Sequence, residues 1–471
     1  MEPAANFQTE IDVEALLMDL MASRQCFETA NNPSGCKIPL DDNGLKPKVM
    51  SIGPYYHDPL KGAMEQEKAA MLYDMLQAWE QQKPAMLTSL LKAVSAVEKE
   101  ARENYFDRVP DMSSHEFVEM LLLDACYILA KFVLPYCCTG GGAISAAGTE
   151  PPDTASQTVS AMHDMELVRD IFYLLGNQIP FCALEKIHEV LHGGSSMSMP
   201  PGTTVVTDTL LTNVRQLLQH FGYSIRNDTL VEPWHLHHLL YMHFQPHNDG
   251  SISSSVAQVD SGRKSKAITY RWRAATYYRA AGVIFRKRHL DHGASKKWWF
   301  WFVDGGARSI LDVRFDGLTL RIPSLMVDNN TYTVLRNLMM LEQHNPDKLG
   351  SHVTAYCVFL SQIAGTASDV ALLVKMGIIV HLMANDIDVA NMLSRLCSGI
   401  TIDLDEPKHN YLHKTRKDVE RTYKNRTIRC GALLWRRHFR NPLLAIAMVA
   451  AVVAFSCQII QAYYTYKAYK P

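Results

Sequence analysis

The feature that most constrains this chain is an uncharged apolar run close to its C-terminus. From Pro442 to Ile460 the sequence reads PLLAIAMVAAVVAFSCQII, which is 19 positions without an acidic or basic side chain. A helix of this length crosses the hydrocarbon core of a bilayer, which is about 30 Å thick. We therefore expect residues 442–460 to form one transmembrane helix, followed by a short tail over 461–471. The alternative is a buried hydrophobic helix of a globular domain.

The charges that flank this run are unequal. Residues 408–440 contain eleven Lys and Arg against two acidic residues, whereas the tail contains two Lys. Because basic residues are enriched on the cytoplasmic side of a membrane helix, this asymmetry predicts a cytoplasmic N-terminal body and a basic juxtamembrane helix over 401–441. The arginines nearest the run are Arg436, Arg437 and Arg440. The first residues, MEPAANFQTEID, lack the basic and apolar regions of a signal peptide, which agrees with a cytosolic body. We expect a single-pass membrane protein, located at the plasma membrane.

The composition is that of a folded protein with no overall charge preference. Hydrophobic residues make up 47% of the chain, and 47 Lys and Arg balance 48 Asp and Glu. We therefore expect no nucleic-acid partner for the molecule as a whole. Basic and aromatic residues do interleave over 263–301, which fits a solvated surface, a membrane surface, or contact with a partner protein or nucleic acid. The ten Cys lack metal-site spacings, which predicts free thiols.

Helical periodicity dominates most of the chain and predicts a mainly α fold. We expect a partly helical N-terminal extension over 1–36 and a large helical body over 37–400. The predicted helices cover residues 11–26, 64–81, 85–105, 115–134, 162–175, 270–281, 330–344, 353–363, 368–376 and 386–396. Flexible insertions are expected near 139–160, 193–204 and 246–266. Residues 309–323 alternate instead, on both sides of Asp316–Gly317, which predicts a small β-hairpin with a two-residue turn.

Seven short blocks occur in an order that is typical of one family. They are VMSIGPYYH (49–57) with MEQEK (64–68), MLLLDACYIL (120–129), NQIPF (177–181) with LEK (184–186), residues 275–285, residues 311–323, LRNL (335–338) with EQ (342–343), and DVALLVKMGII (369–379). On these blocks the chain resembles the plant domain-of-unknown-function 247 family. The resemblance implies a largely helical protein with one C-terminal membrane segment and no established enzymatic chemistry. Some grass members are implicated as male determinants in self-incompatibility, which would be a recognition role.

The blocks also have a structural interpretation in their own right. Pro180 should end one helix and begin the next, because proline lacks the backbone donor and crowds the preceding turn. Asn177 and Gln178 can then satisfy backbone groups freed at the break, with a binding surface as the alternative. The chain departs from the family pattern at Gly176, where an acidic residue is usual, and at residues 36–39, where Cys-Lys-Ile-Pro replaces Ile-Tyr-Arg-Val-Pro.

The sharpest catalytic pattern is HEVLH at residues 188–192, a match to HExxH. On a helix His188 and His192 share a face and could ligate zinc, with Glu189 polarising the attacking water. However, Gly193 follows at once, so His192 would lie in the last helical turn, where a histidine also favours the negative end of the helix dipole. Ser195 occupies the position of the glycine in the extended motif. A membrane-bound zinc metallopeptidase is therefore the alternative hypothesis.

The remaining motifs favour a protein without catalysis. A second group of histidines surrounds an apolar segment, and only two of them fall at helical neighbour spacing, so we expect no joint metal site there. These are His235, His237, His238, His243 and His247. The signatures of serine hydrolases, phosphate loops and dinucleotide sites are absent. We therefore expect no cofactor and no catalytic residue, and predict a non-enzymatic recognition or signalling protein that is tethered to the lipid bilayer and binds an unidentified protein partner.

Overall fold

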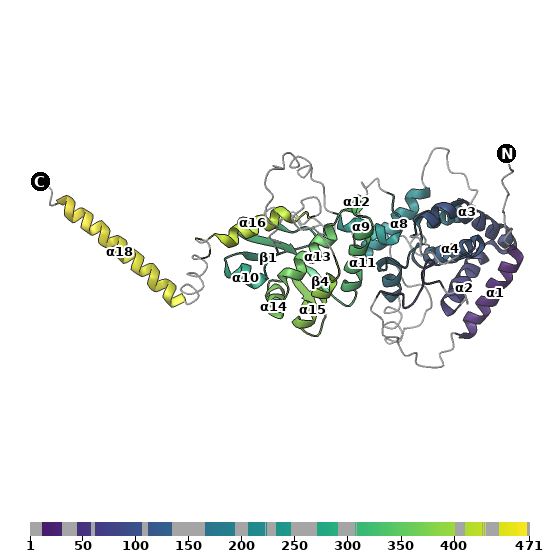
Figure 1. The fold of residues 1–471 in the computed structure, drawn as a ribbon, viewed down its shortest axis with the longest axis horizontal. Helices are drawn as coiled ribbons and strands as arrows, with labels where there is room; N and C mark the ends of the chain where they lie inside the picture. The colour runs from purple at the N-terminus through teal and green to yellow at the C-terminus, as the bar shows by residue number, and fades with distance from the viewer. Residues whose placement is uncertain are drawn as a thin grey trace. The chain divides into compact units, whose positions relative to one another are not determined.

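Figure 1 shows the computed structural model of the chain. It describes residues 12–30, 45–57, 62–105, 112–133, 165–193, 206–221, 223, 232–245, 271–290, 307, 309–400, 410–425, 427, 429 and 442–468. The chain divides into two compact units. The first consists of residues 1–245, 292–296 and 333–345, and the second of residues 246–291, 297–332 and 346–471. The periodicity of the sequence carries no sign of this division.

The first unit contains helices and connecting loops, and no strand, among its described residues. Its elements are α1 (Val13–Ala30), α2 (Ala63–Leu76), the 3-10 helix η1 (Gln77–Gln82), α3 (Lys83–Glu103), α4 (Ser114–Ile128), the π-helical turns η2 (Leu129–Val133) and η3 (Arg169–Tyr173), α7 (Phe181–Gly193), α8 (Val206–His220), α9 (Leu236–Phe244) and most of α11 (Thr331–His344). Helix α1 packs against α2, α2 packs against α4, and α3 packs against α4 and α7. Helices are present in the described parts of the ranges predicted for this unit, whereas α8 was not predicted.

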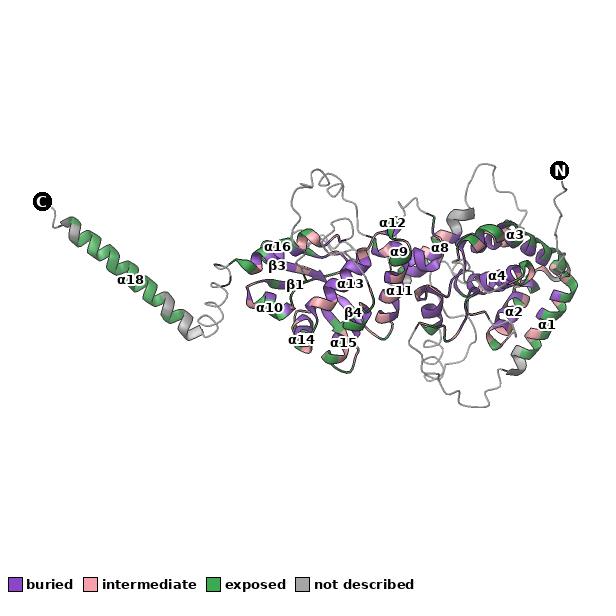
Figure 2. Ribbon diagram, in the orientation of Figure 1, coloured by how far each residue is buried: buried purple, intermediate pink, exposed green. Residues whose placement is uncertain are grey.

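Helix α4 forms the centre of the first unit. Ser113 begins it with a capping box, in which the Ser113 hydroxyl accepts from the Glu116 amide and the Glu116 carboxylate accepts from the Ser113 amide. Between residues 117 and 128 every side chain except that of Glu119 is buried. A helix that is apolar on all sides must be surrounded by other elements, and Figure 2 shows α4 largely in the colour of buried residues.

The second unit combines helices with small sheets. Its elements are α10 (Ala275–Ala280), β1 (Ile284–Arg288), β2 (Arg314–Asp316), β3 (Thr319–Pro323), β4 (Leu325–Val327), α12 (Pro346–Leu349), α13 (His352–Ile363), α14 (Ala367–Lys375), β5 (Ile379–His381), α15 (Asp386–Leu396), α16 (His413–Lys424) and α18 (Pro442–Ala468). One sheet has the order β1-β3-β2, with β1 parallel and β2 antiparallel to β3. Strands β4 and β5 form a second, parallel sheet. The protein is therefore mainly helical with small sheets.

The predicted β-hairpin is present, with its turn one residue further along. Asp316 pairs with Thr319, so Gly317 and Leu318 form the two-residue connection. Gly317 adopts φ +61°, the conformation that favours glycine in such turns. Strand β1 and the β4–β5 pair were not predicted. Strand β1 pairs with β3 and β4 pairs with β5, and both pairings are parallel and join segments that are far apart along the chain. The helix predicted over 270–281 forms only over residues 275–280.

Several predicted segments lie outside the described residues. These are the insertions over 139–160 and 246–266, the insertion over 193–204 from residue 194 on, His247, Arg436, Arg437 and Arg440. The basic segment 401–441 contains helix α16 in its described part. The apolar run forms helix α18, which continues past Ile460 to Ala468. Among the side chains that the structure describes, which leave out residues 442–445, 448 and 449 of the apolar run, no single helix is long and apolar enough to cross a membrane. Helices α13 and α14, bent by 105° at the break between them, meet the length and composition criteria only as a pair.

Candidate functional site

A buried group of charges lies between helices α2 and α4. The Lys68 ammonium is 2.7 Å from Glu65 Oε1 and 2.6 Å from Asp124 Oδ1. The three side chains are 1%, 3% and 0% exposed. Glu65 and Lys68 share a face because they are three residues apart on α2, whereas α4 brings Asp124 from a distant part of the chain. Charges buried this deeply are tolerated when they are paired, as they are here. We call these three residues the ionic cluster.

The loop before α2 is fixed to this cluster through its backbone. The Gly53 amide donates to Asp124 Oδ2 at 2.7 Å, so both oxygens of that carboxylate have partners. Gly53 adopts φ +77°, and a Cβ at this position would lie 2.3 Å from the backbone oxygen of Gln178. The Tyr105 hydroxyl donates to the same oxygen at 3.1 Å. The position therefore requires glycine, both for its backbone angle and for the close approach of another segment.

The NQIPF block fixes the same loop from the other side. Asn177 accepts from the Ile52 amide and donates to the backbone oxygens of Met50 and Asp170. Gln178 donates to the backbone oxygens at the end of η3 and accepts from the His237 amide. Both side chains thus satisfy backbone groups at the helix break, as predicted.

Gly176, immediately before the NQIPF block, lies close to the Tyr56 ring. A Cβ on Gly176 would lie 3.5 Å from the Tyr56 ring, in ordinary contact distance. Six residues earlier, the buried Asp170 carboxylate accepts from the amides of residues 48, 49 and 50 and pairs with Arg169. Burial raises the pKa of Asp170, and these amides and Arg169 oppose that rise. Asp170 therefore has a structural role in fixing the start of the loop.

His57 completes the charged group at the end of the loop. Its Nδ1 is 3.6 Å from Glu65 Oε1. Interaction with Glu65 raises the pKa of His57 above its usual value, although burial opposes the rise. Burial would raise the pKa of Glu65, but His57 and Lys68 outweigh it and the net pKa is lowered. Burial likewise opposes the charge on Lys68, yet Asp124 and Glu65 raise its pKa. Glu65 and Lys68 are therefore charged at neutral pH.

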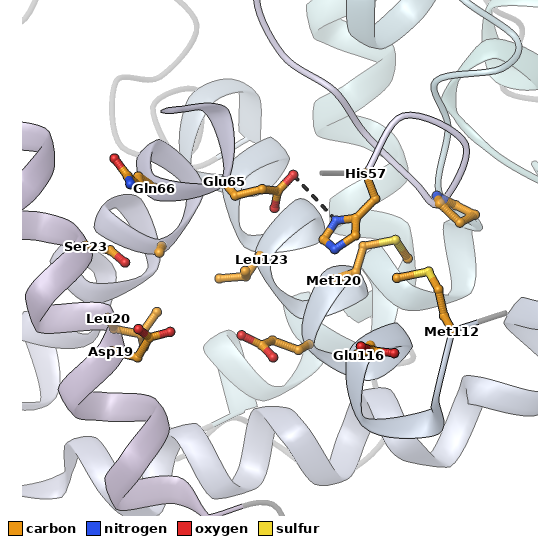
Figure 3. Close-up of a pocket in the computed structure, with 13 residues that line it drawn as sticks. Asp19, Leu20, Ser23, His57, Glu65, Gln66, Met112, Glu116, Met120 and Leu123 are labelled. Atoms are coloured by element: carbon orange, nitrogen blue, oxygen red, sulfur yellow. Dashed lines mark ion pairs between the residues drawn. The ribbon is translucent and has the colours of Figure 1, made fainter. Parts of the chain in front are cut away.

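A cavity of about 290 Å³ opens beside Glu65 and His57. Figure 3 shows its lining, with Glu65 and His57 facing each other across their ion pair. The polar lining residues are Asp19, Ser23, His57, Glu65, Gln66, Glu116 and Glu119, and the apolar ones are Leu20, Pro54, Ala69, Met112, Met120 and Leu123. Among these described lining residues there is no Lys or Arg. Glu65 Oε2 is buried and has no hydrogen-bond partner among the described residues, so one carboxylate oxygen in the wall is unsatisfied.

The predicted zinc ligands lie elsewhere, at the end of α7. His188 is 1% exposed, and its Nε2 has no hydrogen-bond partner among the described residues. The His192 ring stacks on it at 3.9 Å between centroids, and its Nδ1 is 3.0 Å from the His188 backbone oxygen. Glu189 pairs with Lys186 at 2.8 Å. Burial lowers the pKa of His188 to about 4. Within the described ranges, no group of three His, Cys, Asp or Glu side chains could hold a metal.

The second histidine group has structural contacts. His235 caps α9 by accepting from the His238 amide, and His238 in turn accepts from the Trp234 amide. The His237 Nδ1 lies 2.8 Å from the backbone oxygen of Phe172. Burial lowers the pKa of both His237 and His238 to about 4. The His237 ring therefore ties α9 to the turn η3, whereas His235 and His238 fix the start of α9.

The sequence blocks MEQEK and MLLLDACYIL contain Glu65, Lys68 and Asp124, but the sequence did not predict that these residues form one site. Two signals point to it. Glu65 and Lys68 are spaced as an ion pair on one helix, and Asp124 is a single charge within the apolar block MLLLDACYIL. The contact between Lys68 and Asp124 joins residues that are far apart in sequence, so periodicity alone could not reveal it.

Comparison with known proteins is consistent with this reading of the blocks. Residues 37–457 match the family model DUF247, described as a plant protein of unknown function. The UPF0481 protein At3g47200 of Arabidopsis thaliana is 23% identical over 454 residues, which cover 92% of this chain and 87% of that protein. The putative UPF0481 protein At3g02645 of the same plant is 32% identical over 115 residues, which cover 24% of this chain and 21% of that protein. No solved structure matches. The chain belongs to the DUF247 family of plant proteins of unknown function.

Proposed function

We propose that this protein is a non-enzymatic recognition protein, tethered to a membrane by helix α18 with its body in the cytoplasm. The observation that carries the tether is α18 itself, a continuous helix of 27 residues. Its described large apolar side chains from Ile446 to Ile460 are between 55% and 66% exposed, as Figure 2 illustrates. Exposed apolar area is unfavourable in water by about 25 cal/mol per Å², so a helix of this composition requires an apolar environment. A bilayer supplies one.

The residues on either side of α18 support the proposed orientation. Helix α16 and the chain after it belong to the stretch 408–440, which is rich in Lys and Arg. Basic residues are favoured near the anionic cytoplasmic leaflet by about 1 kcal/mol each. At the other end, Tyr463 and Tyr464 are 60% and 64% exposed, and such rings favour the interface between lipid and water.

The cavity beside the ionic cluster supports recognition in preference to catalysis. A serine hydrolase would need Ser23 within hydrogen-bond distance of the His57 ring. Figure 3 shows these two residues on opposite sides of the cavity, with Ser23 on α1 and His57 on the loop before α2. The carboxylates of the cavity are joined to fixed partners, such as the Glu116 cap of α4 and the Glu65 pair with Lys68. This arrangement suits a rigid binding site.

The tether is tested by expressing the full chain with a fluorescent protein at its N-terminus. We expect it in the membrane fraction after extraction with alkaline carbonate, and we expect a variant lacking residues 442–468 in the soluble fraction. A matched control replaces the apolar residues of the Pro442–Ile460 run with a Leu-rich sequence of equal length, which should restore membrane retention. Release of the full chain by carbonate would refute the tether.

The orientation is tested separately in the same cells. After selective permeabilisation of the plasma membrane, added protease should digest the N-terminal body of the tethered protein. Asn329 is exposed and begins an Asn-Asn-Thr glycosylation triplet, so it serves as an internal reporter. Glycosylation at Asn329 would place the body on the other side of the membrane and contradict the proposal.

A further inference from the structure

We propose that the cavity beside Glu65 binds a small organic cation, a protonated amine carried on a short apolar group. This inference deepens the recognition half of the proposed function and does not depend on the membrane tether. It rests on three features of the first unit: the unsatisfied oxygen of Glu65, the charge of the cavity wall, and the size and chemistry of the remaining lining.

The unsatisfied oxygen defines where the ligand donates its hydrogen bond. Glu65 is 3% exposed, and its Oε1 pairs with Lys68 and faces His57. Its Oε2 has no hydrogen-bond partner among the described residues, although the side chain lines the cavity. A buried carboxylate oxygen that accepts no hydrogen bond is unfavourable. An N–H group that enters the cavity and donates to Oε2 removes this penalty.

The charge of the wall selects a cation. Four carboxylates line the cavity, those of Asp19, Glu65, Glu116 and Glu119, against the one imidazole of His57, which faces Glu65, and the described lining includes no Lys or Arg. The nearby Lys68 ammonium is shared between Glu65 and Asp124 at 2.7 and 2.6 Å, within the ionic cluster. An anionic ligand would therefore be repelled, and a neutral one would gain only a hydrogen bond without charge assistance.

The other side chains explain why the cation is organic. Within the described residues no group of three His, Cys, Asp or Glu side chains could hold a metal ion. Glu116 is engaged in the capping box of α4, and Glu119 lies 3.7 Å from His115. Another part of the lining is apolar and includes Met112 and Met120, whose flexible thioethers adapt to different shapes. An amine with an apolar body matches both parts of the lining.

The volume limits the size of that body. At about 290 Å³ the cavity is at the lower end of the range of about 300–1,000 Å³ that is typical of small-molecule pockets. A single aromatic ring or a short alkyl chain fits such a space with the ammonium group at Glu65. A larger ligand would require α1 or the loop before α2 to move.

The proposal is tested with a series of probes that differ only in charge. The full chain in lipid nanodiscs is titrated with 2-phenylethylammonium, with neutral 2-phenylethanol and with anionic 3-phenylpropanoate, and binding is measured by isothermal titration calorimetry. Empty nanodiscs correct for partition into lipid. We expect the ammonium to bind at least tenfold more tightly than the alcohol and the carboxylate not to bind. Equal affinity for the ammonium and the alcohol would overturn the proposal.

Two variants locate the binding in this cavity. Glu65→Gln keeps the shape of the side chain and removes its charge, and we expect the affinity for the ammonium to fall at least tenfold. Ala69→Met fills the cavity from the same helix without changing any charge, so it tests the site even if Glu65→Gln does not fold. Glu103→Gln, an exposed carboxylate at the end of α3, is the matched control and should bind like the wild type. Wild-type binding by folded Ala69→Met protein would refute the assignment.

The outcome is distinguishable from a failure of the membrane tether. If carbonate releases the full chain and the ammonium still binds, the tether is wrong and the cavity assignment stands. If the protein stays in the membrane and no probe binds, the cavity assignment is wrong and the tether stands.

Discussion

At the scale of single residues, Lys68 is the side chain on which the ionic cluster depends. Its ammonium is the only cation within the cluster as defined, and it faces two buried carboxylates. Its removal leaves Glu65 and Asp124 without compensation in a poorly hydrated region. Leaving a buried charge unpaired costs more free energy than the intact ion pair contributes. Truncation of Lys68 is therefore a sensitive test of how strongly the cluster affects stability.

We expect Lys68→Met to lower the free energy of unfolding of the first unit by about 3–5 kcal/mol, measured by urea denaturation. Lys92→Met on α3, where the side chain is exposed, is the control and should change stability by less than about 0.5 kcal/mol. Adding Glu65→Gln and Asp124→Asn to Lys68→Met should recover part of the loss, because the uncompensated charges are removed. A loss for Lys68→Met no larger than that of Lys92→Met would contradict the role of the cluster.

His57 makes the stability of this region depend on pH. The group faces Glu65 and Lys68 on α2 and Asp124 on α4, and the interaction with Glu65 raises its pKa in the folded protein. Protonation is therefore favoured by folding. Its contribution is complete below the unfolded pKa of about 6.5 and is lost as the pH rises through the higher folded value.

Unfolding of the wild type and of His57→Gln should be compared between pH 5 and pH 8. We expect the wild type to be more stable at the acidic end, and the difference to shrink towards pH 8. His344→Gln, at an exposed position of α11, controls for the loss of a histidine in general and should show no such trend. A difference that grows with pH would mean that the sign of the His57 interaction is wrong.

At the scale of elements, local patterns predicted most of the helices, although not α8, and contacts between distant segments explain the strands that were missed. The capping box of α4 and the apolar periodicity of α2, α3 and α11 lie within short stretches of sequence. The hairpin β2–β3 is also local and was predicted. Strand β1 pairs with β3 in parallel, and β4 pairs with β5, so neither pairing leaves a mark in the nearby sequence. The same holds for Asp124, whose partner lies on another helix.

The turn glycines provide a test at this scale, because they have similar backbone angles in different surroundings. Gly317 has φ +61° and open space within 4 Å of where a Cβ would lie, whereas Gly53 has φ +77° with the Gln178 oxygen 2.3 Å from that point. We expect Gly317→Ala to cost about 1 kcal/mol of backbone strain and Gly53→Ala to cost more than about 2 kcal/mol. Hydrogen–deuterium exchange of residues 46–57 should rise in Gly53→Ala alone. Equal effects would show that the close approach is unimportant.

At the scale of the whole molecule, near-neutral net charge conceals charges of opposite sign in separate regions. The chain carries a formal charge of −1, yet the cavity of the first unit is lined by four carboxylates and the stretch before α18 is strongly basic. Overall composition thus indicated no ligand class, whereas the acidic cavity favours cations and the basic stretch favours an anionic surface. The sequence identified the basic region because its charges are contiguous. The acidic cavity could not be identified, because its carboxylates come from α1, α2 and α4.

The hydrogen bond from the Gly53 amide to Asp124 also bears on how ligand preference can change between related chains. The ionic cluster and the backbone amides of the loop hold the site in shape, because their charges and hydrogen bonds are directed mainly at one another. The walls that would touch the body of a ligand, such as Leu20, Met112 and Met120, belong to none of those contacts. Of these, Met112 is partly exposed whereas Leu20 and Met120 are buried core residues, so a substitution at Met112 can alter the proposed ligand preference with the least effect on folding. Related chains could thus acquire distinct specificities by a few changes in the walls, with the charged anchor left in place.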